Sequence, residues 1–144
     1  MVEGERSSLD AIVRIDSHSV DFLISRVAIP YTNIPIVLKE IRRLLNDNGR
    51  IWITLHSGKM VRGWLKRSIK SGEFKDIVHK SYVLLNGYLF KYFGFLIPFI
   101  KGGYESWQDE GALIKALAKN GIMATAKEVD GHSIVEGKVK EPSD

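Results

Sequence analysis

The chain has 144 residues, 44% of them apolar and 26% charged, which is the composition of one globular domain and not of a disordered or fibrous protein. Its formal net charge is +4, and acidic and basic residues alternate along most of it, which argues against a dedicated nucleic-acid surface. There is no cysteine, so disulfides, thiolate nucleophiles and cysteine-ligated metals are excluded, and a cytoplasmic location is compatible with the sequence. The first six residues, MVEGER, include three charged side chains and no apolar core segment, which is not typical of a signal peptide.

The first regular element is expected at 20–25, where VDFLIS forms an almost continuous apolar run. Such a run predicts a strand covered on both faces, as parallel strands in α/β proteins are. A helix is expected next, with Asn33 as N-cap and Pro35 in its first turn. Its apolar residues fall at helical spacing, at Ile34, Val37, Leu38, Ile41, Leu44 and Leu45. Residues 46–49, NDNG, tolerate positive φ and predict a tight turn that ends the helix.

A second strand is expected at 50–56, because RIWITLH is rich in β-branched and aromatic residues. Two strands joined by a helix predict a right-handed βαβ crossover with a parallel pair, 20–25 and 51–56. In open sheets of this kind, ligands bind beyond the carboxyl ends of the strands. We therefore expect the chemistry at 25–31 and 56–60.

Three stretches of this unit carry a resemblance to a known family. They are DFLIS at 21–25, IRRLL at 41–45 and NGRIWI at 48–53. Together they resemble the signature of class I S-adenosylmethionine-dependent methyltransferases. The resemblance implies an α/β, Rossmann-like sheet in which these strands are the fourth and fifth of seven.

The same resemblance assigns candidate cofactor contacts. Residues 2–9 are similar to the end of the family's third strand, where an acidic residue binds the adenine, so Glu5 and Arg6 are candidate cofactor-binding residues. Ser25 and Arg26, where the first predicted strand ends, are the other two. The chain is then expected to begin inside the fold, as a truncated form of it.

The family's glycine-rich cofactor turn is not found in this sequence. No G-x-G-x-G run occurs, and Gly58 and Gly102-Gly103 are the nearest approximations. We expect neither to follow a strand and open a helix in the way such a turn requires. S-adenosylmethionine is accordingly expected as a cofactor only if the missing half of the fold is supplied.

A helical insertion is expected at 59–100, and the resemblance makes 59–106 a lid within one domain of residues 1–144. Its first part predicts a basic amphipathic helix broken at Ser71-Gly72, either a solvated face or a contact for anions or a membrane surface. Residues 74–93 predict a second helix that ends at Gly94, followed by an apolar loop. The apolar stretch 82–100 is either buried on the sheet or exposed for an apolar acceptor, a membrane surface or a partner.

The last third of the chain predicts a helix and a hairpin. Ser106 and Asp109 have capping-box spacing before a helix that stops at Asn120-Gly121. Residues 122–139 predict an antiparallel hairpin around Asp130-Gly131. These elements match the way the family's sheet closes.

His56 and Tyr31 are the candidate catalytic residues. His56 ends the second predicted strand and is a candidate general base. Tyr31 lies in the loop where the family lines its acceptor side. The remaining histidines show no metal-ligand spacing, so no metal site is predicted.

Two functions stay open at this point. The chain is the acceptor-side half of a methyltransferase, or it is a non-catalytic methyltransferase-like scaffold that assembles with a partner. In either case the edge of the strand at 20–25 is expected to pair with a second copy, as a homodimer, or with another chain, because bare apolar edges are avoided.

Overall fold

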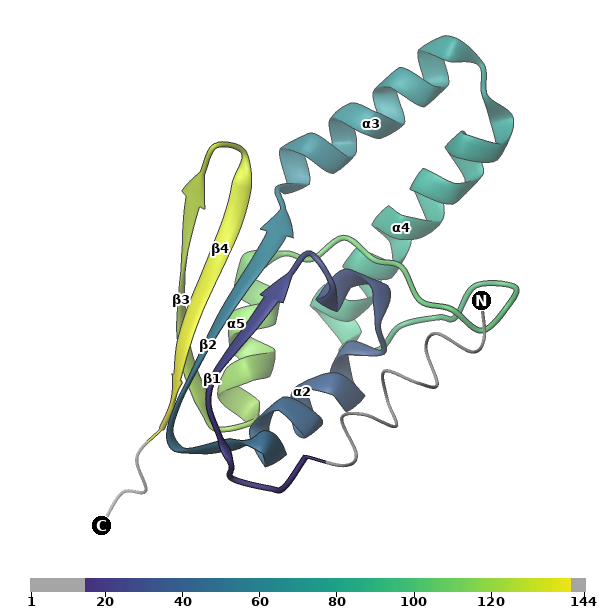
Figure 1. Cartoon of the computed structure of the whole chain (residues 1–144). Coiled ribbons are helices and arrows are strands. Elements are labelled where there is room, and N and C mark those ends of the chain that lie inside the picture. The colour runs from purple at the N-terminus through teal and green to yellow at the C-terminus, as the bar shows by residue number, and fades with distance from the viewer. Residues whose placement is uncertain (1–14, 141–144) are drawn as a thin grey trace.

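The structure, a computed structural model, describes residues 15–140. Its elements in chain order are β1 (Val20–Arg26), the short 3-10 helix η1 (Ile29–Tyr31), α2 (Ile34–Leu44), β2 (Leu45–His56), α3 (Gly58–Ser71), α4 (Phe74–Phe93), α5 (Glu110–Lys119), β3 (Ile122–Val129) and β4 (His132–Val139). Figure 1 shows α2 and α5 beside the sheet, and α3 and α4 as a hairpin that projects beyond the end of β2.

The four strands form one sheet in the order β1-β2-β4-β3. β1 and β2 are parallel and are joined through α2, while β4 runs antiparallel to both β2 and β3. The predicted parallel pair and the predicted hairpin around Asp130-Gly131 are therefore both confirmed. The α/β fold class is confirmed as well.

One face of the sheet carries the core of the molecule. Alternate residues of β2, namely Ile51, Ile53 and Leu55, are at most 2% exposed. They pack against α2 and α5, which contribute Ile34, Leu38, Ile41, Leu113 and Leu117 to the same cluster. The helical spacing that predicted α2 thus identified its buried side correctly. We call this side the covered face.

Within residues 15–140 no helix covers the opposite face, which corrects the expectation that 20–25 is covered on both sides. Phe22 and Ile24 of β1 are 53% and 56% exposed, and Met123 of β3 is 58% exposed. The strand register places Phe22 level with Arg50 and Ile24 level with Trp52 across the sheet. We call this side, made of alternate residues from all four strands, the bare face. A continuous apolar run suits two-sided burial, but α2 and α5 supply cover on one side only.

The junction of α2 and β2 also differs from the prediction. The chain passes from Leu44 directly into an extended Leu45, and Gly49 is not among the residues with positive φ. Residues 46–49 instead bulge out of β2, because Val20 pairs with Leu45 while Phe22 already pairs with Arg50. Asn46 donates its amide to Asp21 across this bulge, and its Oδ1 accepts from the N–H of Asn48, so the chain turns here through side-chain contacts and without positive φ.

The predicted helical insertion is confirmed, with one correction at the helix that follows it. Gly72 and Gly94 adopt left-handed conformations at the ends of α3 and α4, as their sequence positions predict. Asp109, and not Ser106, is the N-cap of α5, and its carboxylate accepts a hydrogen bond from the backbone N–H of Ala112. Ser106 is instead drawn away by a tertiary contact with Pro30.

Candidate functional site

The carboxyl ends of β1 and β2 lie side by side, as the parallel pairing requires. Val27, directly after β1, has a φ of 53°, which is unusual for a β-branched residue, and its N–H donates to the carbonyl of Thr54. The turn leads into η1, which presents Tyr31 at its last position. Strained backbone of this kind is common at functional sites.

The segment 104–108, YESWQ, crosses over these strand ends and ties them to α4. The N–H of Ser106 donates to the carbonyl of Pro30 at 2.9 Å, and the N–H of Trp107 donates to the carbonyl of Val83 at 3.1 Å. Asn86, which is 1% exposed, donates its amide to the carbonyls of Ile97 and Glu105. The segment is therefore held by β1's loop on one side and α4 on the other.

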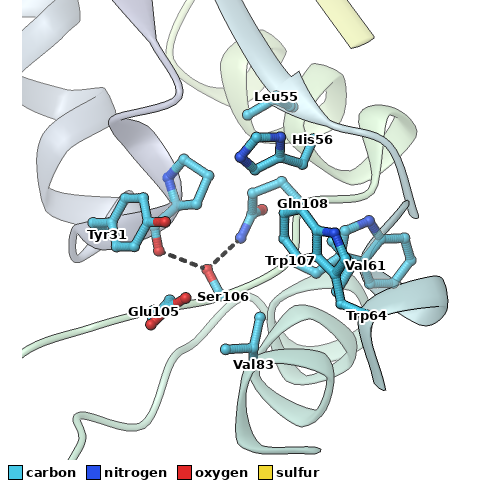
Figure 2. A pocket seen from close by; sticks show the side chains of 11 residues that line it. Tyr31, Leu55, His56, Val61, Trp64, Val83, Glu105, Ser106, Trp107 and Gln108 are labelled. Carbon is cyan, nitrogen blue, oxygen red and sulfur yellow. Dashed lines mark hydrogen bonds between the residues drawn. The ribbon is translucent and has the colours of Figure 1, made fainter. Parts of the chain in front are cut away.

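A small cavity of about 30 Å³ lies under this segment. Figure 2 shows the side chains around it, with Tyr31 at the left, His56 at the top with Gln108 beneath it, and Trp107, Val61 and Trp64 at the right. The cavity is lined by Pro30, Tyr31, Leu55, His56, Val61, Trp64, Val83, Glu105, Ser106, Trp107 and Gln108. This volume corresponds to about one water-sized group.

His56 reaches the cavity from the last position of β2. Its ring lies 5.0 Å from the ring of Trp64 at 73° and 5.5 Å from the ring of His132, its cross-strand neighbour. Burial, and secondarily the positive charge that His132 can carry, lower the pKa of His56 below its ordinary value. His56 is therefore a neutral imidazole near pH 7, the form that accepts a proton.

Tyr31 has the opposite tendency. Desolvation of the phenol, and secondarily the nearby Glu105 carboxylate, raise the pKa of Tyr31, so it stays protonated at neutral pH and can donate a hydrogen bond. Glu105 itself lies 2.6 Å from Nε2 of His79 on α4. The cavity is thus lined by a hydrogen-bond donor, Tyr31, and by a potential proton acceptor, His56.

Three buried polar atoms have no hydrogen-bond partner within the part of the chain that the structure describes. They are His56 Nδ1, Gln108 Oε1 and Trp107 Nε1, and all three residues line the cavity. Gln108 is 3% exposed, and its Nε2 donates to Ser106 Oγ at 2.6 Å, which leaves its carbonyl oxygen free (Figure 2). Buried polar atoms without partners are costly, so their concentration around one cavity marks it as a place for a polar group.

The structure brings together two of the six predicted site residues. His56 and Tyr31 line the same cavity, whereas Ser25 and Arg26 do not. Because Ser25 and Arg26 are successive strand residues, their side chains point to opposite faces of the sheet. Glu5 and Arg6 lie outside the described residues. Within residues 15–140 no group of three acidic or histidine side chains could hold a metal ion.

The glycines test whether the described residues could hold the cofactor's methionine and sugar end. Gly58 is the first residue of α3, shortly after β2. A Cβ on Gly58 would lie 2.8 Å from Cζ2 of Trp107, so the space beside this glycine is filled by the indole and not open to a ligand. The space beside Gly58 therefore does not fit that end of the cofactor.

Sequence reasoning missed His132, Glu105, Trp107 and Gln108 as parts of this site. His132 could have been found from the hairpin register, because its strand pairs with β2 at His56. The other three lie on an irregular segment whose position depends on Asn86 and Pro30, and no periodic pattern indicates that contact.

Comparison with known proteins gives structural likeness alone. No family model and no curated protein matches the sequence. A possible histamine N-methyltransferase from Thermotoga maritima is 14% identical with a TM-score of 0.51, over 88% of this chain and 59% of that protein. The 1,6-didemethyltoxoflavin-N1-methyltransferase of Burkholderia thailandensis, solved with S-adenosylhomocysteine, is 11% identical with a TM-score of 0.51, over 90% and 48%. A putative methyltransferase from Haloferax volcanii, in complex with the activator Trm112, is 14% identical with a TM-score of 0.51, over 89% and 57%.

The chain has the fold of class I S-adenosylmethionine-dependent methyltransferases. It spans about half to three fifths of the length of these three solved proteins. Within the methyltransferase fold, β1 and β2 are the parallel strands whose carboxyl ends carry Tyr31 and His56, and β3 and β4 are the antiparallel strands that close the sheet.

Proposed function

We propose that this chain is the acceptor-side half of an S-adenosylmethionine-dependent methyltransferase and that another polypeptide segment completes it. The observation that carries the proposal is that His56 and Tyr31 line the same cavity, at the carboxyl ends of two parallel strands. In open α/β sheets this is the edge where ligands bind. The bound S-adenosylhomocysteine of the Burkholderia protein supports S-adenosylmethionine as the methyl donor.

Methyl transfer to an amine or hydroxyl requires alignment and the removal of one proton from the acceptor. We propose that neutral His56 takes this proton. The Tyr31 phenol, which stays protonated, is proposed to donate a hydrogen bond to the acceptor. Segment 104–108 and the α3–α4 hairpin would then act as the lid that excludes water from the acceptor.

The partner surface in this proposal consists of the outer edge of β1 and the bare face. Phe22 and Ile24 are more than half exposed there, and β1 pairs with β2 on one side only among the described strands. A strand edge with large apolar side chains is a site of pairing with another chain. The Haloferax complex supports association with a partner in this fold. A second copy of this chain and a different polypeptide are both possible occupants of the edge.

A second candidate function is a non-catalytic scaffold. It is favoured by the packing at Gly58, where an indole fills the space that a cofactor turn would leave open. A scaffold would use the sheet and its open edge for assembly and would not bind the methyl donor. The cytoplasmic location suggested by the sequence is a proposal in both cases.

Calorimetric titration with S-adenosylmethionine separates the two functions. The purified chain, and any complex that it forms, would be titrated together with a His56→Ala variant as a control that should retain cofactor binding. Micromolar affinity would support the enzyme. Absence of heat at millimolar ligand, in both the chain and its complex, would contradict the enzyme and support the scaffold.

Sedimentation velocity tests the partner surface. Ile24→Glu should abolish association through β1, because it places a charge at the centre of the exposed apolar strip. Ile36→Glu, at a similarly exposed position on α2, is the matched control and should leave association intact. A wild-type chain that stays monomeric, alone and with candidate partners, would contradict this part of the proposal.

A further inference from the structure

Helix α4 is apolar on its outer side as well as on its packed side. Its buried residues are Val83, Asn86, Gly87 and Phe90. A second set, which we call the outer stripe, comprises Phe74, Val78, Leu85, Tyr88 and Tyr92 and is 41% to 75% exposed. Steps of three, four or seven residues separate its members, which puts them along one line of the helix. Large apolar side chains along the exposed line of a helix are exposed apolar surface that marks an interaction site, so the outer stripe requires an explanation.

The apolar surface continues past the end of the helix. Phe93, Phe95 and Ile100 are 71%, 48% and 91% exposed, and the loop that carries the last two is held to α4 through the amide of Asn86 and Ile97. Exposed apolar surface of this extent marks a contact with a partner or a lipid phase. No helix among residues 15–140 is both long and apolar enough to cross a bilayer. A contact of this region with lipid would therefore be at the membrane surface.

The charge of the same region is strongly positive. Residues 58–103 contain nine lysines and arginines but only Glu73 and Asp76 as acids, a net charge of +7. Because the whole chain carries +4, the remaining residues sum to −3. Lys66, Arg67 and Lys70 on α3 and Lys75 on α4 gather near the tip of the hairpin, and all four are exposed. The tip projects away from the sheet, where it can meet an extended surface (Figure 1).

We propose that the α3–α4 hairpin docks on an anionic lipid surface, with the outer stripe of α4 at the boundary of headgroups and acyl chains and the basic residues at the tip on the lipid phosphates. Helices that lie in the interface combine an apolar line with lysine and arginine, and tyrosine side chains favour headgroup level. A second copy of the chain is the poorer occupant, because it would bring a second region of +7 against the first. Nucleic acid would satisfy the charge but leave Phe74, Val78 and Leu85 exposed to water.

Co-sedimentation with vesicles tests the proposal on the full chain. Vesicles of phosphatidylcholine containing about a third phosphatidylserine should bind at least about tenfold more tightly than pure phosphatidylcholine, and added salt should weaken the binding. Phe74→Ser together with Leu85→Ser should reduce binding at least about tenfold, because both side chains lose their contact with the acyl boundary. Both positions are more than half exposed, so the folded chain tolerates the change.

A matched double variant controls for general loss of apolar surface. Ile36→Ser with Ile15→Ser removes two exposed apolar side chains, 55% and 41% exposed, that lie outside both the α3–α4 hairpin and the bare face, and should leave vesicle binding unchanged. The proposal is overturned if wild type does not bind anionic vesicles, or if the control loses binding as much as the α4 variant. It is also overturned if the α4 variant binds as wild type does while Lys70→Glu with Lys75→Glu does not, since that result means adsorption by charge alone.

Self-association in lipid-free solution that the α4 variant abolishes would overturn the proposal in favour of a second copy. Preferential binding to RNA that the α4 variant retains would overturn it in favour of nucleic acid.

Discussion

The two faces of the sheet are built from neighbouring residues of the same strands but have opposite environments. Ile53 on the covered face is fully buried, while Ile24, in the adjacent strand and one position out of step, is 56% exposed on the bare face. Both are isoleucines in a run that gives no sign of which face lacks cover. Apolar patterning therefore reports the environment that a strand is suited to, and the elements available decide which environment it has.

The largest expected effect compares these two isoleucines. Ile53→Ala should lower the free energy of unfolding by about 2–5 kcal/mol, because it leaves a cavity in the core. Ile24→Ala should cost less than about 1 kcal/mol, because its side chain is already half in water. Urea unfolding followed by circular dichroism measures both. Equal costs would mean that the bare face is buried in solution by a partner or a second copy.

A glycine on the covered face gives the next largest effect. A Cβ on Gly137 would lie 3.0 Å from Cγ2 of Ile122 and from Cγ1 of Ile51, so Gly137→Ala should cost about 1–3 kcal/mol through overpacking. Gly63→Ala in α3 is the control, because no atom lies within 4 Å of the added Cβ, and it should stabilise the chain by about 0.5–1 kcal/mol. Thermal unfolding compares them. If Gly137→Ala proved neutral, the covered face would be packed more loosely than its burial indicates.

The smallest expected effect on stability concerns His56, which ends β2 on the bare face and lines the cavity. Its pKa is lowered from the ordinary 6.5 by burial and by His132, so its contribution to stability is complete above about pH 6.5 and is lost as the pH falls through the lowered value. The loss should stay below about 1 kcal/mol, because the ring is partly exposed to solvent. Titration of the histidine resonances by NMR should place the His56 midpoint below 6.5.

Two variants make this measurement specific. His132→Gln should move the His56 midpoint upward by part of the shift only, since burial is the larger cause. His18→Asn, which replaces an exposed histidine with a residue that also tolerates the positive φ found there, should leave the midpoint unchanged. A His56 midpoint at or above 6.5 in wild type would remove the basis for assigning it the role of proton acceptor.

Local sequence patterns predicted the fold well where a helix or turn is determined by interactions within a few residues. The spacing of Leu38 and Ile41, the left-handed glycines after α3 and α4, and Asp130-Gly131 in the hairpin act over a few residues, and the structure confirms each. The errors arose where a contact with a residue distant in the sequence outweighs the local preference. Ser106 leaves its predicted capping role because Pro30 offers a carbonyl, and residues 46–49 turn without positive φ where Asp21 accepts from Asn46.

The candidate site was predicted to the same extent and for the same reason. Strand ends are local features, so His56 and Tyr31 could be named as candidates, and the structure places both at one cavity, while their catalytic roles stay a prediction. Gln108 and Trp107 enter through an irregular segment anchored by the buried Asn86, and such anchoring depends on tertiary packing. Their place in the site could be recognised only from the structure, where both residues line the cavity with His56 and carry a buried polar atom without a partner among the described residues.

The bulge at 46–49 has a consequence for how this chain can change in length. Pairing between β1 and β2 stops at Leu45 and resumes at Arg50, so the residues between them can gain or lose a member without altering the partners that follow. The same insertion after Arg50 would exchange the two sides of β2, sending Trp52 toward α2 and α5 and Ile53 toward solvent. Insertions and deletions are therefore tolerated at residues 46–49 and not among the paired residues of β2 that follow.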